Sequence, residues 1–207
     1  MQSIRKVLTA LALALAGISA ASAHVALETP EAKVGGGYKA VFKVPHGCEG
    51  SATVEITIDI PEGVIAVKPM PKPGWTIELQ KGPYAGSYAF YHGKTVSEGV
   101  RRVTWRGGPL PDDYFDEFVL STFIAGELPP GTKLAFPVTQ RCEQGEIAWV
   151  EVAQEGKDAH ALKSPAPQLV LTAREQGHAH DAGAARAGTD AVPLSVKATG
   201  ASGQHAH

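Results

Sequence analysis

The chain has 207 residues, of which 43% are hydrophobic, and 19 basic residues against 21 acidic ones give a formal net charge of −2. This near balance argues against nucleic acid or an anionic membrane as partner, because both attract strongly basic surfaces. The G-x-S-x-G, P-loop and H-E-x-x-H motifs do not occur in the sequence. Hydrolases and nucleotide-binding enzymes of those kinds therefore have no support.

Residues 1–23 have the form of a cleaved secretion signal. Two basic residues precede an apolar run from Val7 to Ile18, and Ala21 and Ala23 form the A-x-A pattern of a signal peptidase site. The run is about a dozen residues, whereas a bilayer span needs about 20, so a retained anchor is the less favoured alternative. After cleavage the remaining chain would contain 17 basic and 21 acidic residues. It would be located in the periplasm or outside the cell.

The next 150 residues, 24–173, read as one domain of short strands. The clearest strand is Thr53–Ile60, where isoleucines and a valine alternate with polar residues, so that one face packs and the other meets water. In chain order, strands are predicted over residues 25–28, 38–44, 53–60, 64–68, 76–79, 88–91, 101–106, 118–124, 134–139, 147–152 and 168–172. Proline and glycine separate nearly all of them and no helical period is sustained. The pattern predicts an all-β, antiparallel sandwich.

Two cysteines, Cys48 and Cys142, are present. In an oxidising compartment an even count favours a disulfide, and the C-x-x-C spacing of a metal site is missing. The bond would close a loop of about 95 residues, for which the chain-entropy model gives roughly 4 to 5 kcal/mol.

Residues 174–207 are predicted to form a disordered tail, because they contain no Phe, Trp or Tyr with which to build a core. The tail nevertheless holds four of the eight histidines, as the pairs His178/His180 and His205/His207. Such pairs suit transition metals and predict a secondary metal site. They are equally consistent with histidines that are simply polar residues of a low-complexity tail.

His24 is the sharpest candidate for chemistry. If cleavage follows Ala23, His24 carries a free α-amine, and that amine and the imidazole Nδ1 can chelate one metal ion once both are deprotonated. Nitrogen donors of this kind favour Cu(II). The alternative is that His24 merely begins the first strand. His46 and His92 each precede a glycine and are read as loop residues.

Several stretches resemble the YcnI-like copper-binding domain family, a bacterial secreted domain formerly of unknown function. The resemblance covers about 150 residues and rests on His24 directly after the signal, YKAVFKVPHGC (38–48), IPEGVIAVKPMPKPGW (60–75), LPDDYFDEF (110–118) and IAW (147–149).

The resemblance implies an immunoglobulin-like sandwich that binds Cu(II) through the amine and imidazole of His24, with Trp149 close to the metal. Family members add a carboxylate ligand, and alignment on Lys43-Val44-Pro45 places that position near Tyr38, which is no carboxylate. The candidates to replace it are Glu28, Glu143, Glu146 and Tyr38 itself.

The resulting hypothesis is a periplasmic protein, and not an enzyme, that sequesters Cu(II) or delivers it to other periplasmic copper chaperones. The first alternative is a copper-dependent oxidase or monooxygenase with an N-terminal histidine site. Such a site needs a second histidine side chain from the fold, for which only His46, His92 and His160 remain. The second alternative is a metal-free sandwich used for protein contacts.

Overall fold

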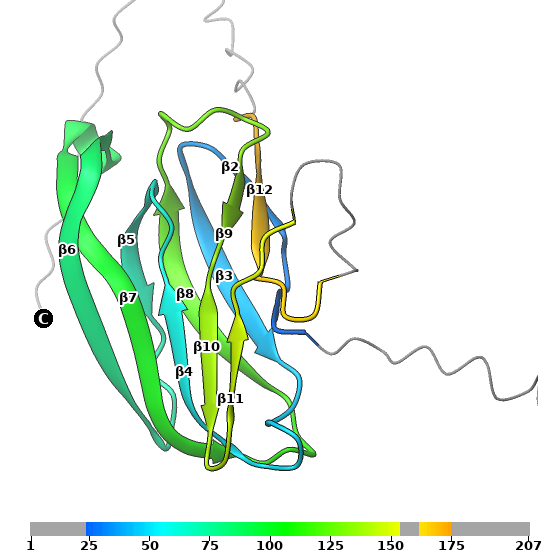
Figure 1. The fold of residues 1–207 in the computed structure, drawn as a ribbon. Helices are drawn as coiled ribbons and strands as arrows, with labels where there is room; N and C mark the ends of the chain where they lie inside the picture. The colour runs from blue at the N-terminus through cyan, green and yellow to red at the C-terminus, as the bar shows by residue number, and fades with distance from the viewer. Residues whose placement is uncertain (1–23, 154–161, 175–207) are drawn as a thin grey trace, which may run out of the picture. The chain divides into compact units, whose positions relative to one another are not determined.

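The computed structural model describes residues 24–153 and 162–174, and most of this part of the chain is β-strand (Figure 1). The helical structure in the described residues is one 3₁₀ turn, η1 (Tyr91–Gly93). No helix among these residues is both long and apolar enough to cross a bilayer.

One sheet has four antiparallel strands in the order β1-β3-β8-β5. Its members are β1 (Ala26–Leu27), β3 (Gly36–Val44), β8 (Asp116–Ile124) and β5 (Val64–Pro69). The longest pairing joins β3 to β8 and runs from Gly36 opposite Ile124 to Val44 opposite Asp116. The short strand β1 lies at the edge of this sheet, which places the N-terminal residues of the described chain at an edge as well.

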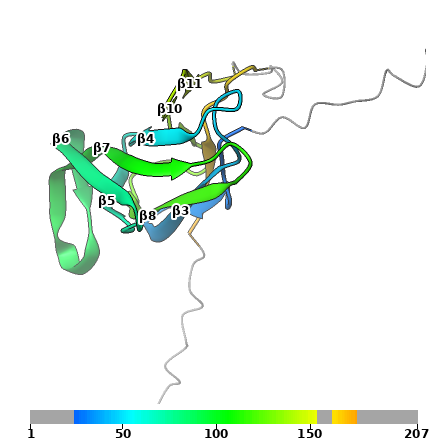
Figure 2. The same cartoon turned by 90° about the horizontal axis from the view of Figure 1, so that it is seen from below.

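A second antiparallel sheet has five strands in the order β11-β10-β4-β7-β6. They are β11 (Glu146–Trp149), β10 (Val138–Cys142), β4 (Thr53–Asp59), β7 (Thr95–Leu110) and β6 (Trp75–Ala89). Figure 2 looks along the strands and shows β4 and β7 on one side of the domain and β3 and β8 on the other. The all-β, antiparallel sandwich predicted from the sequence is confirmed.

A third group of strands, in the order β2-β12-β9, borders the sandwich. It contains β2 (Glu31–Lys33), β12 (Gln168–Thr172) and β9 (Lys133–Ala135), and β12 pairs in parallel with β2. Because β12 returns to a strand near the N-terminus, the last described strand is tied to the beginning of the domain.

The core lies between the two large sheets and is centred on aromatic rings. Phe118 of β8 meets Trp105 of β7 at 5.4 Å and Trp75 of β6 at 5.1 Å between ring centroids, both edge to face. On β4, Ile56 and Ile58 are fully buried. The alternation read from the sequence of β4 therefore directs its apolar face into the core.

The strands β6 and β7 form a long hairpin that projects to one side of the other strands (Figure 2). It carries a second, smaller cluster, in which Tyr84 of β6 packs with Ile65 and Phe123. Gly99 of β7 makes room for this packing, since a Cβ there would collide with the hydroxyl of Tyr84. Pro83 is tolerated because β6 is the edge strand, where a missing N–H breaks no ladder.

Some predicted strand boundaries were wrong. The separate strands predicted over 76–79 and 88–91 belong, apart from the last two residues, to the single strand β6, and the strand predicted over 134–139 is divided into β9 and β10. Between the latter two, Phe136 donates its N–H to Pro167, whereas Pro137 accepts from Asp59 of β4. The chain therefore changes partners at a proline that cannot donate to either sheet.

Strand β2 was not predicted. Nearly all of the predicted tail, and all four of its histidines, lie outside the described residues.

Candidate metal site

His24 lies against Trp149, the residue that the resemblance places beside the metal. The ring centroids are 5.5 Å apart and the planes are inclined by 56°. His24 is half-buried, and Trp149, the last residue of β11, is only 4% exposed. Two residues separated by more than 120 positions in the sequence are thus brought together where β1 and β11 each form the edge of a sheet.

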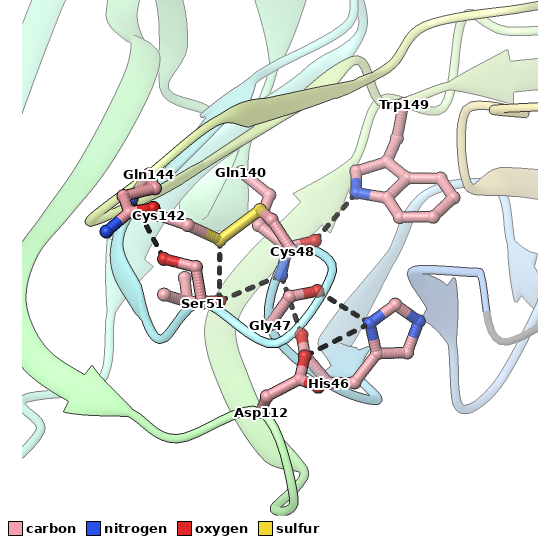
Figure 3. Close-up of a disulfide and its surroundings, with 10 residues drawn as sticks. His46, Gly47, Cys48, Ser51, Asp112, Gln140, Cys142, Gln144 and Trp149 are labelled. Carbon is pink, nitrogen blue, oxygen red and sulfur yellow. Dashed lines mark hydrogen bonds and ion pairs between the residues drawn. A yellow bond between two sulfur atoms is a disulfide. The ribbon is translucent and has the colours of Figure 1, made fainter.

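Trp149 is held in place by a buried glutamine. Its Nε1–H donates to Oε1 of Gln140 at 3.0 Å, and Gln140 is fully buried on β10 (Figure 3). The amide nitrogen of Gln140 donates to the backbone carbonyl of His46 at 2.7 Å and to the hydroxyl of Thr53 at 2.8 Å. Both ends of the amide are therefore satisfied, which fixes its orientation and that of the indole.

The predicted disulfide between Cys48 and Cys142 is present, with Cα atoms 6.0 Å apart. It joins the turn after β3 to the end of β10, close to Gln140 (Figure 3). The turn is tight, because a Cβ at Gly47 would collide with the carbonyl oxygen of Ser51. The disulfide and Gln140 thus fasten the same turn to the strand that supports Trp149.

His46, read from the sequence as a loop residue, lies in this turn. Its Nδ1 is 2.6 Å from the Gly47 carbonyl oxygen and 4.0 Å from Oδ1 of Asp112. The Asp112 carboxylate comes from the acidic stretch 110–118. Sequence reasoning gave no role to Gln140 and considered His46 only as a second histidine for the copper-oxidase alternative.

Of the carboxylates considered as further ligands, Glu28 forms an exposed ion pair with Lys43 at 3.4 Å. It is four residues beyond His24, or about 13 Å along an extended chain. Glu146 begins β11 and pairs with Arg141, about 10 Å along the strand from Trp149. Glu143 is exposed, and its backbone N–H donates to Ala52.

Tyr38 lies away from His24. Its hydroxyl donates to the carbonyl of Thr29 at 2.6 Å, and burial raises the pKa of Tyr38 to about 12. The pairing of β1 with β3 places the residues before Ala26 at the Val44 end of β3. Tyr38 precedes Val44 by six residues of β3, which is about 20 Å along the strand. A neutral phenol at that distance speaks against Tyr38 as a ligand to an ion bound at His24.

In the described part of the chain, no three His, Cys, Asp or Glu side chains are grouped so as to hold a metal ion. Side chains alone therefore do not provide a three-ligand site there. A main-chain amine, such as the one expected at His24 from the sequence, is not among these side chains. The tail histidines His178, His180, His205 and His207, like His160, lie outside the described residues.

The family model for a domain of unknown function, DUF1775, matches residues 24–171. The chain belongs to the DUF1775 family. A crystal structure of an uncharacterized protein from Nocardia farcinica, which reveals an immunoglobulin-like fold, is similar to this DUF1775 chain with a TM-score of 0.54 and 28% sequence identity. The similarity covers 73% of this chain and 99% of that one, so the immunoglobulin-like architecture is confirmed. No curated protein matches the sequence.

Proposed function

We propose that this DUF1775 protein is a YcnI-like, periplasmic Cu(II)-binding protein that holds the ion through the α-amine and the imidazole Nδ1 of His24. The observation that carries the proposal is the packing of His24 against Trp149 at 5.5 Å. The contact holds the imidazole of the first residue after the expected cleavage site beside a buried, hydrogen-bonded indole, which is the arrangement that the family resemblance implies for the metal.

The donors fit Cu(II), which prefers nitrogen ligands in a tetragonal plane. An amine and an imidazole on the same residue occupy two neighbouring positions of such a plane. Because the Nε1–H of Trp149 is taken by Gln140, the indole serves as an apolar wall on one side of the site. Both donors must lose a proton to bind, so copper affinity falls as the pH is lowered.

In this proposal copper is cargo, and the protein is not an enzyme. A site at a chain terminus is open to a partner, which suits the sequestration of the ion or its delivery to other periplasmic copper chaperones. The mildly acidic chain beginning at His24 is consistent with a cationic cargo.

The proposal is tested with the chain that begins at His24 and with its His24→Ala variant. Each is titrated with Cu(II) by calorimetry and followed by electron paramagnetic resonance. We expect the variant to lose the tight site, with a changed spectrum. Equal affinity and unchanged spectra would remove His24 from the site, and a loss seen only when the four tail histidines are replaced by serine would move the site to the tail.

Two further measurements separate the alternatives. A copper oxidase would consume oxygen in the presence of a reductant, whereas a carrier should not. A metal-free interaction module would show no change in melting temperature with Cu(II), whereas an ion that binds the folded state must raise it.

A further inference from the structure

The turn that carries His46 is fastened to the same glutamine as Trp149. The amide of Gln140 accepts from Trp149 through its oxygen and donates to the His46 carbonyl through its nitrogen. Because Gln140 is fully buried, this bridge fixes the backbone of His46 relative to the indole (Figure 3). An ion bound by His24 beside Trp149 would therefore lie near a turn whose backbone is fixed relative to the indole.

Strand register brings His24 to the same turn. In the β1–β3 pair, Leu27 is opposite Phe42 and Ala26 is opposite Lys43. Continued by two residues beyond the paired strand, this register would set His24 opposite Pro45, the residue before His46. Cα atoms opposite each other in antiparallel strands are about 4.5 to 5.5 Å apart. The two histidines thus come to one end of the β1–β3 pair.

The imidazole of His46 has the hydrogen bonding of a metal ligand. The Gly47 carbonyl can only accept, so in the neutral imidazole of His46 the Nδ1 carries the proton and the Nε2 carries the lone pair. Metal-binding histidines usually have their other ring N–H fixed by a carbonyl or carboxylate in this way, and Asp112 adds a carboxylate at 4.0 Å. In Figure 3 the Nε2 lies on the side of the ring away from Gly47 and Asp112.

We propose that His46 supplies Nε2 as a second imidazole ligand to the copper ion held by His24, an inference that rests on the proposed function. The ligand set is then three nitrogens: the amine and Nδ1 of His24 and the Nε2 of His46. Such a set needs only two side chains, which agrees with the absence of a three-side-chain cluster in the described residues. In this set His46 takes the place of the carboxylate expected near Tyr38.

The test uses the full chain from His24, with the four tail histidines replaced by serine and one equivalent of Cu(II). Electron spin-echo envelope modulation counts the coordinated imidazoles from their remote nitrogens. We expect two in this parent protein and one in His46→Gln, together with a loss of affinity of about tenfold or more. His92→Asn is the matched control, since His92 also precedes a glycine and Asn accepts its positive φ of 58°. It should change neither quantity.

The outcomes are distinguishable. One imidazole in the parent that is lost in His24→Ala, or two that persist in His46→Gln, would overturn the role of His46 and leave the proposed function standing. A spectrum that does not change in His24→Ala would overturn both. Because His46→Gln retains the carbonyl that Gln140 needs, its metal-free melting temperature should stay close to that of the parent, which excludes misfolding as the cause of a loss.

Discussion

Gln140 and Trp149 form a buried hydrogen bond, 3.0 Å from indole nitrogen to amide oxygen, and the amide nitrogen of Gln140 donates to the His46 carbonyl, so that together the two bonds connect the edge of the five-stranded sheet to the turn after β3. We expect Gln140→Leu to lower the free energy of unfolding by about 3 kcal/mol, because the indole N–H and the His46 carbonyl lose their partner. Urea denaturation measures the change.

The matched control for this change is Gln144→Leu. Gln144 is exposed in the β10–β11 turn, and its backbone N–H donates to the hydroxyl of Ser51. We expect an effect within about 0.5 kcal/mol. Equal losses for the two variants would show that the amide bridge of Gln140 adds no stability of its own.

The disulfide between Cys48 and Cys142 spans 94 positions of the sequence. Replacing both cysteines by alanine frees a long loop in the unfolded chain, for which the chain-entropy model gives a loss of about 4 to 5 kcal/mol. Urea midpoints of the parent and the double variant measure it. An unchanged midpoint would mean that the unfolded chain is constrained by something other than the crosslink.

The sequence predicts the sandwich well where alternation is strong and turns are marked by proline and glycine. The strands at 53–59 and 168–172 were predicted almost to the residue, and the disulfide followed from compartment and count. The long hairpin was not predicted, since residues 80–87, which include Gly82 and Pro83, lie between the predicted strands 76–79 and 88–91. At an edge strand these residues interrupt nothing that another strand requires.

At the candidate site, sequence reasoning identified His24 and Trp149 but not what holds them. Gln140 is a lone polar residue in a strand, and its importance comes from burial, which only the fold determines. His46 was read as a loop residue because the register that brings it towards His24 depends on the pairing of β1 with β3. The link between these residues is long-range and leaves no local pattern.

The small cluster under the β6–β7 hairpin depends on the absence of a side chain at Gly99. A methyl group there would meet the Tyr84 hydroxyl, so we expect Gly99→Ala to cost about 1 to 3 kcal/mol. Gly86→Ala is the control in the same hairpin, since a Cβ there meets nothing within 4 Å. Thermal melts compare the two. A larger effect at Gly86 would contradict the packing described for Tyr84.

Tyr38 should make stability depend on alkaline pH. Burial raises its pKa to about 12, whereas an unfolded tyrosine ionises near about 10. Below pH 10 both states keep the proton and the contribution is constant. Between about 10 and 12 the unfolded state gains an extra charge, so stability falls by up to about 1.4 kcal/mol per pH unit.

Tyr38→Phe isolates this effect, because other groups titrate in the same range in both proteins. We expect the difference in unfolding free energy between parent and variant to shrink as the pH rises from about 10 to about 12. Urea denaturation at a series of pH values measures it. Parallel curves for the two proteins would show that the phenol ionises equally in the folded and unfolded states.

The central claim is that copper is bound by a free α-amine and the imidazole of the same residue, His24. The most direct measurement compares Cu(II) affinity and paramagnetic resonance of the chain that begins at His24 with a chain that carries one glycine before it. The added residue keeps the imidazole and moves the amine. We expect the tight site and its spectrum to be lost, and retention of both would contradict the amine-imidazole chelate.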